Sequence, residues 1–167
     1  VGISAGGRTP YVRGGLSRAK AAGSFTVALT CNTTAPIVDG VSVVIAPQVG
    51  PEVIAGSTRL KSGTAEKLVL NMLTTAAMVR LDKTYGDLMV DLRAVSAKLR
   101  ERALRILQLT TAADESRARA VLESTGWALK PAIVMLRAGV DRVEAERRLA
   151  VANGSLRRAL GELPAFS

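Results

Sequence analysis

Residues 1–10 read VGISAGGRTP: the end of an apolar run, a loop of small residues and the start of a helix. Pro10 suits the first turn of a helix, where its missing N–H would have no partner, and Thr9 before it is a natural N-cap. The pattern predicts a helix over residues 11–22, because Gly23 has the conformational freedom that a helix end commonly requires. This stretch therefore predicts a strand, a loop and a helix in succession.

Two further short runs, residues 25–30 and 41–46, are rich in β-branched and apolar residues and indicate buried strands. Strands that alternate with a helix favour an α/β fold with parallel pairing. Two strands and the stub of a third are too few for a stable parallel sheet, which needs helices on both faces. Because the chain also has no initiating Met, we expect it to be the C-terminal part of a longer protein.

Helical patterns dominate from residue 57 onward. Ser57 or Thr58 is positioned to cap a helix over residues 59–81, in which apolar residues recur as a one-sided stripe. A second helix is predicted over residues 94–107, with apolar and charged residues on opposite faces.

The C-terminal part of the chain predicts a compact all-helical unit. Three short helices with polar caps and Gly stops are expected over about residues 114–124, 130–137 and 141–153. Asp141 and Glu144 have the spacing of a capping box. We therefore predict an α/β domain over residues 1–107 and a small three-helix domain over residues 108–167.

Composition excludes several kinds of chemistry. The chain of 167 residues has no His and one Cys, which excludes a disulfide framework, the usual zinc ligand sets and imidazole catalysis. The net charge is +9, but it is spread along the chain, and only 3% of residues are aromatic, so nucleic-acid binding is not favoured. No apolar run approaches the roughly 18 to 20 residues of a membrane span. With no signal-peptide pattern, we expect a cytoplasmic protein without a metal site.

Two loops have the composition of an anion-binding site. The first, residues 4–9, offers the hydroxyls of Ser4 and Thr9 and lets the backbone approach closely at Gly6 and Gly7. It follows a strand and precedes a helix, which is where open α/β sheets bind ligands. The alternative is a plain turn.

The second loop, residues 50–61, also lies between a strand and a helix. Ser57 and Thr58 offer hydroxyls at the positive end of that helix, Arg59 adds a cation, and Glu52 is either a site carboxylate or a surface acid. The alternative here is an ordinary capped helix. Cys31 is interpreted as a small buried residue, because the chain has no His to activate a thiol.

Several motifs in order give the chain a resemblance to the N-acetylmuramic acid 6-phosphate etherase family. They are residues 2–12 (GISAGGRTPYV), 30–32 (TCN), 49–53 (VGPEV), 56–65 (GSTRLKSGTA), 67–73 (KLVLNML), 85–91 (YGDLMVD) and 132–136 (AIVML). The resemblance implies the C-terminal part of a sugar isomerase (SIS) domain, a parallel α/β sandwich, followed by a small helical domain similar to a ubiquitin-associated (UBA) module.

What the resemblance implies about function is a cytoplasmic lyase of cell-wall sugar recycling. Such an enzyme cleaves the D-lactyl ether of N-acetylmuramic acid 6-phosphate by elimination and water addition, without a cofactor, as a homodimer. Ser4, Gly7 and Thr9 match the family's sugar-phosphate loop; Gly6 stands where the family usually has Ser. Ser57, Thr58 and Arg59 match a second ligand-facing loop, with Glu52 a further candidate.

The family's acid and base glutamates lie before the position of Val1, so no residue of this chain is assigned to proton transfer and the chain alone is expected to be inactive. The alternative function is a non-enzymatic sugar-phosphate-binding regulator that resembles glucokinase regulatory protein. Such a regulator would use the same loops to control a partner.

Overall fold

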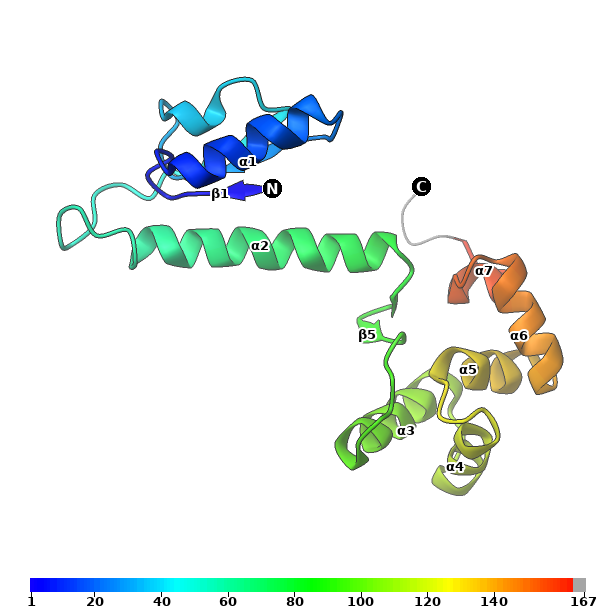
Figure 1. Ribbon diagram of the computed structural model, residues 1–167. Coiled ribbons are helices and arrows are strands. Elements are labelled where there is room, and N and C mark those ends of the chain that lie inside the picture. The colour runs from blue at the N-terminus through cyan, green and yellow to red at the C-terminus, as the bar shows by residue number, and fades with distance from the viewer. Residues whose placement is uncertain (164–167) are drawn as a thin grey trace. The chain divides into compact units, whose positions relative to one another are not determined.

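The computed structural model describes residues 1–163 and has a mixed α/β fold. The chain divides into two compact units, Val1–Thr74 and Thr75–Ser167 (Figure 1). The last four residues of the predicted domain 108–167 lie outside the described residues. No helix of the described part of the chain is both long and apolar enough to span a membrane.

The first unit contains a three-stranded parallel sheet in the order β1-β2-β3, formed by β1 (Gly2–Ile3), β2 (Val27–Leu29) and β3 (Val43–Ile45). The helix α1 (Pro10–Ala21) and a 3-10 helix η1 (Pro36–Val38) connect these strands. The predicted α/β class and the parallel pairing are both confirmed.

One face of this sheet is covered by α1. Leu16 of α1 packs with Ala28, Ala35 and Ile37 in a small core. The contact is close because Gly2 has no side chain: a Cβ there would lie 2.6 Å from Cδ1 of Leu16. Small residues on the strands thus let the helix approach the sheet, which secures the local packing.

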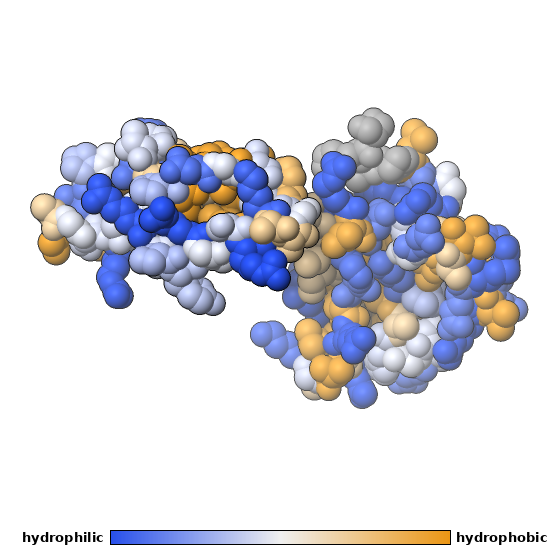
Figure 2. All heavy atoms as spheres, turned by 45° about the horizontal axis from the view of Figure 1, so that its top comes forward, coloured by the Kyte–Doolittle hydropathy of each residue, from blue (hydrophilic) through white to orange (hydrophobic). Residues whose placement is uncertain are grey.

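The start of α2 (Lys61–Arg80) lies on the other side of the sheet from α1 (Figure 1) and covers part of that face, since Ile3 remains exposed. Leu29 alternates with Ala28 along β2, so its side chain points away from α1, and it is fully buried. Further along α2, Leu68 and Met72 are half exposed, so the predicted apolar stripe is not covered by the described residues. Figure 2 shows such hydrophobic side chains at the surface among hydrophilic ones.

The second unit contains a β-hairpin after α2 that the sequence analysis did not predict. The strands β4 (Thr84–Tyr85) and β5 (Leu88–Met89) pair antiparallel across Gly86 and Asp87. Gly86 has φ 60°, and hairpin turns of two residues commonly need a positive φ at this position.

After the hairpin, the described part of the second unit contains five helices: α3 (Ala97–Thr111), α4 (Glu115–Ser124), α5 (Leu129–Ala138), α6 (Arg142–Val151) and α7 (Leu156–Ala159). Asp141 caps α6, and its side chain accepts from the amide of Glu144 at 2.8 Å. The Glu144 carboxylate instead binds Arg147 and Arg148, and these contacts lower its pKa to about 2. The capping residue was therefore predicted correctly, without the reciprocal half of the capping box.

The predicted boundary between residues 107 and 108 falls inside α3. Four residues of α3 (Ala103, Leu104, Ile106 and Leu107) belong to the same hydrophobic core as α4 to α7. Their burial against the later helices joins α3 to the second unit. The compact helical unit therefore contains more helices than the three expected from the sequence.

Candidate functional site

The loops expected to bind an anion leave the same edge of the sheet. Because β1, β2 and β3 are parallel, residues 4–9, 30–35 and 46–60 all begin at its carboxyl edge. Open α/β sheets bind ligands at this edge.

The first loop is closed by the hydroxyl of Ser4. Ser4 Oγ accepts from the amide of Gly7 at 3.2 Å and lies 3.0 Å from Thr9 Oγ1. Thr9 occupies the N-cap position of α1 as predicted, but its side chain makes no cap hydrogen bond. The structure therefore brings the Ser4 and Thr9 hydroxyls together just before the positive end of α1.

Gly7 and Gly6 differ sharply in their surroundings. Gly7 has φ 66°, and a Cβ there would lie 2.3 Å from Cβ of Ala35 and 2.9 Å from Cγ2 of Ile37. A Cβ on Gly6 would meet nothing within 4 Å. Gly7 is thus required by the conformation and packing of the loop, whereas Gly6 is open to the surface.

Thr30 fixes the loop to the sheet. Its buried hydroxyl donates to the carbonyl of Ala5 at 3.1 Å and accepts from the amide of Asn32 at 3.2 Å. In the described part of the chain, the amides of Gly6, Arg8 and Thr9 have no protein acceptor. A loop held rigidly with exposed amides and two hydroxyls has the donors that an anion requires.

Glu52 in the second loop holds the start of α2. Its carboxylate accepts from the amide of Lys61 at 2.9 Å and from the amide of Ser62 at 3.0 Å. These two backbone hydrogen bonds, first that from Ser62, hold the pKa of Glu52 below its usual value. The carboxylate thus satisfies the positive end of this helix within the chain.

The predicted cap of α2 by Ser57 or Thr58 is wrong. The helix begins at Lys61, two residues later than expected, and its first amides bind Glu52. Ser57 Oγ accepts only from the nearby amide of Arg59, at 3.5 Å. A carboxylate is a stronger acceptor than a hydroxyl, and it reaches the helix from nine residues upstream.

Cys31 adjoins both loops. Its amide donates to the carbonyl of Ala5 at 3.0 Å. Burial raises the pKa of the Cys31 thiol, the Ser62 hydroxyl opposes this by hydrogen bonding, and the carboxylates of Glu66 and Glu52 raise it further. The first loop and the start of α2 are therefore both in the neighbourhood of one residue, at the carboxyl end of β2.

Glu66 is a neighbour of this junction that the sequence reading missed. Its Oε1 is buried and has no hydrogen-bond partner among the described residues. Desolvation raises the pKa of Glu66. The signal in the sequence is its spacing, since Glu66 lies one helical turn after Ser62 and so on the same face of α2.

Comparison with known proteins shows what the chain is similar to. No protein-family model matches the chain. Three curated proteins, each named N-acetylmuramic acid 6-phosphate etherase, are similar to it. The protein of Serratia proteamaculans is 54% identical over 96% of the chain, that of Rubrobacter xylanophilus 56% over 97%, and that of Cronobacter sakazakii 51% over 96%. Over nearly all of its own length the chain is thus similar to proteins named N-acetylmuramic acid 6-phosphate etherase.

The chain spans about half the length of these etherases, 53–54% of each. The identity extends over nearly the whole chain, and so over both of its compact units.

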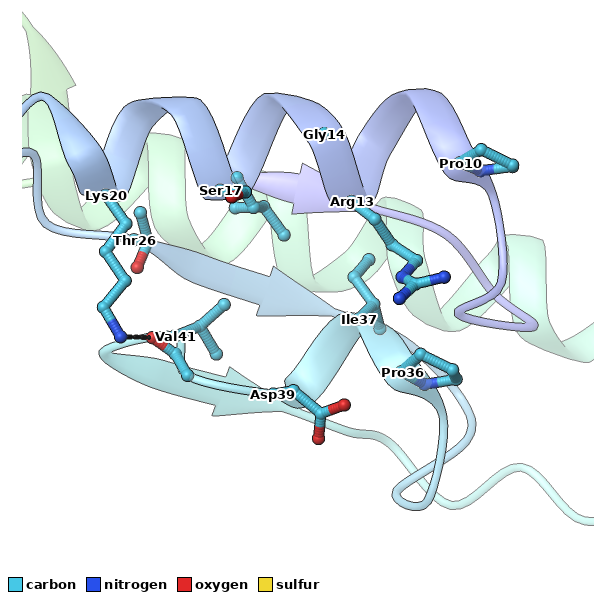
Figure 3. A pocket seen from close by; sticks show the side chains of 12 residues that line it. Pro10, Arg13, Gly14, Ser17, Lys20, Thr26, Pro36, Ile37, Asp39 and Val41 are labelled. Carbon is cyan, nitrogen blue, oxygen red and sulfur yellow. Dashed lines mark hydrogen bonds between the residues drawn. The ribbon is translucent and has the colours of Figure 1, made fainter.

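The first unit also contains a hollow of about 550 Å³. Arg13 and Lys20 of α1 and Asp39 after η1 line it (Figure 3). None of the eight predicted binding residues is among the residues that line it. The hollow nevertheless borders the first loop, because Pro10 and Ile37 line it: Pro10 follows Thr9, and the amide of Ile37 donates to the carbonyl of Gly7 at 3.2 Å.

Proposed function

We propose that this chain forms the sugar-phosphate-binding part of an N-acetylmuramic acid 6-phosphate etherase, a carbon–oxygen lyase. The observation that carries the proposal is the identity of 51–56% over almost the entire chain with proteins of that name. The substrate is a phosphorylated amino sugar, and the products are N-acetylglucosamine 6-phosphate and D-lactate.

In this proposal residues 1–107 include part of a SIS-type domain, and residues 108–167 form a UBA-like module. Three parallel strands between α1 and the start of α2 support the first assignment. The helices α4 to α7 support the second. The enzyme works in the cytoplasm as a homodimer, and the exposed apolar side chains of Leu68 and Met72 suit contact with further protein.

The phosphate of the sugar binds at the first loop. The hydroxyls of Ser4 and Thr9 and the amide of Gly6 donate to its oxygens, and the positive end of α1 favours the negative charge. Gly7 acts through its conformation, since its own amide already donates to Ser4.

The second loop contacts the sugar through its exposed residues. Thr58 and Arg59 are exposed, and Ser57 is half-buried. Glu52 acts indirectly, because both of its carboxylate oxygens are engaged with the start of α2. It is therefore a positioning residue for the Ser57–Arg59 segment.

The reaction is an elimination followed by an addition. A base removes the proton from carbon-2 of the open-chain sugar, the bond from carbon-3 to the lactyl oxygen breaks, and D-lactate leaves. Water then returns a hydroxyl to carbon-3 and a proton to carbon-2. Carboxylates outside this chain carry out the proton transfers, whereas the residues of this chain bind and orient the sugar.

A chimera tests the proposal. The segment of the Serratia proteamaculans relative that matches this chain is replaced by the chain, and D-lactate release from N-acetylmuramic acid 6-phosphate is measured. We expect release, and a loss of about a hundredfold or more in kcat/KM when Ser4→Ala and Thr9→Val are combined, since each removes a hydrogen bond to a charged group worth about 1.5–3 kcal/mol. The matched control is Ser17→Ala, on an exposed part of α1.

Two outcomes would contradict the proposal. A chimera that melts cooperatively and is stabilised by the sugar phosphate, yet releases no lactate, would reject the lyase and support a regulator resembling glucokinase regulatory protein. The etherase names of the relatives do not favour that alternative. If the Ser4 and Thr9 double variant is as active as Ser17→Ala, the phosphate does not bind at the first loop.

A further inference from the structure

The second unit contains a cavity that the proposed etherase chemistry does not use. It has a volume of about 480 Å³ and lies between the extended residues 90–95 and the start of α5. A single antiparallel bridge between Arg93 and Ala128 joins these two segments. The volume is in the range of small-molecule sites.

The cavity has an apolar floor and an aromatic wall. Val90 and Leu129 are almost completely buried, and Leu149 is nearly so. The wall includes Trp127, which is half-buried. Its amide donates to the carbonyl of Leu122 at 2.7 Å, which holds the backbone of this residue in place.

Trp127 is also held in an unusual conformation. Its φ is 65°, a region in which bulky residues are rare. The guanidinium carbon of Arg100 lies 5.2 Å from the centre of its ring, within the range of a cation–π contact. The contact with Arg100 favours one orientation of the indole, which lowers the ordering cost when a ligand binds.

The polar part of the cavity has an excess of positive charge. Lys130 and Arg93 line it together with one acid, Asp91. Asp91 already forms an ion pair with Lys83. The cavity thus combines an apolar floor with two cations, and the one acid beside them is also paired with Lys83.

Lys130 is the central cation. Its side chain is only 12% exposed, and its ammonium donates to the carbonyl of Gly154 at 2.8 Å. Asp91 Oδ1 is 4.0 Å away, beyond hydrogen-bond distance. An ammonium has three donors, so two remain unfilled within residues 1–163. Burial accordingly lowers the pKa of Lys130, and Asp91 offsets this effect only in part.

We propose that this cavity is a second ligand site, which binds a small organic carboxylate with an apolar or aromatic body. The carboxylate accepts from Lys130 and Arg93, and the body lies against Trp127 and the apolar floor. The site is independent of the sugar-phosphate loops, so it stands whether or not the etherase assignment holds.

The test uses Trp127 as its own reporter, because it is the only Trp in the chain. The full 167-residue chain is titrated with 3-phenylpropionate, and the tryptophan emission is recorded. The neutral isostere 3-phenylpropionamide is titrated in parallel. We expect a saturable change with the carboxylate and at least about tenfold weaker binding of the amide, as the loss of charge-assisted hydrogen bonds predicts.

Two variants locate the binding energy. Lys130→Met keeps the apolar stem and removes the charge, and should weaken 3-phenylpropionate binding by about tenfold or more. Arg93→Gln replaces an exposed side chain, is not expected to disturb folding, and should weaken binding severalfold. The matched control is Lys98→Met, an exposed lysine of the same unit that does not line the cavity.

Three results would overturn the proposal. They are the absence of a saturable change in emission, equal binding of acid and amide, and unchanged binding in both Lys130→Met and Arg93→Gln. Circular dichroism melts show whether Lys130→Met is folded. If Lys130→Met is not folded, 3-phenylpropionate binding by Arg93→Gln alone decides whether the proposal holds.

Discussion

Replacing Gly7 by Ala tests the geometry of the first loop directly. The new Cβ would lie 2.3 Å from Cβ of Ala35, 2.9 Å from Cγ2 of Ile37 and 3.0 Å from Oγ1 of Thr30. Ala35 and Thr30 are buried and bonded into the sheet edge. They therefore cannot move aside without loss of their own contacts.

Two costs add at this position. A non-glycine residue at φ 66° costs about 1–2 kcal/mol, and overpacking of a filled site costs typically about 1–3 kcal/mol. We expect Gly7→Ala to lower the free energy of unfolding of the first unit by about 2–5 kcal/mol. With a urea m-value of about 1–2 kcal/mol/M, the unfolding midpoint should fall by at least about 1 M.

The assay uses the reactivity of Cys31, the only Cys. Its thiol is partly buried beside the start of α2, so the rate at which a thiol reagent modifies it at increasing urea reports unfolding of the first unit. Emission of Trp127 reports the second unit in the same samples and should not change.

Gly6→Ala is the matched control, because a Cβ there meets nothing within 4 Å and Gly6 has no positive φ. It should be neutral or stabilising by up to about 1 kcal/mol. The reasoning is refuted if Gly7→Ala keeps the wild-type urea midpoint, or if the two variants lose the same stability.

Two further predictions concern helix caps. The pKa of Glu52 is lowered by its hydrogen bonds to the start of α2, so its contribution to stability is present above its ordinary pKa of 4.5 and is lost as the pH falls through the lowered value. At pH values below 4.5, the urea concentration at which Cys31 loses half of its protection should therefore decrease. Glu52→Gln should remove part of this pH dependence. Asp39→Asn, which changes an exposed acid of the same unit, should not. In the second unit, Asp141→Ala should cost about 1 kcal/mol of stability and Asp141→Asn only a few tenths, because Asn caps helices about as well as Asp. Urea unfolding followed by Trp127 emission measures this difference. If both variants lose the same free energy of unfolding, the side-chain cap of α6 does not stabilise the unit.

Local signals in the sequence were sufficient for several helix ends and for the strands of the parallel sheet. Gly23 and Asp141 lie at the predicted ends of α1 and α6, because capping depends on residues within about one turn of the helix. The parallel pairing of the sheet followed from the order of its elements.

Other features depend on contacts that no local pattern contains. The hairpin β4–β5 was missed because each strand has only two residues, too short to show alternation. The cap of α2 was assigned to the adjacent hydroxyls of Ser57 and Thr58, whereas Glu52 reaches it from nine residues away.

The amino-acid sequence by itself determined the order of strands and helices, most of their ends and the similarity to the etherases. These properties depend on neighbouring residues or on the order of motifs, both of which are visible in one dimension. Only the tertiary structure decided that Cys31 adjoins both loops, that α3 packs with the C-terminal helices, and that Lys130 and Trp127 share a cavity. Each of these features depends on contacts between side chains that are far apart in the sequence. Such contacts form only when the folded chain buries these side chains against one another.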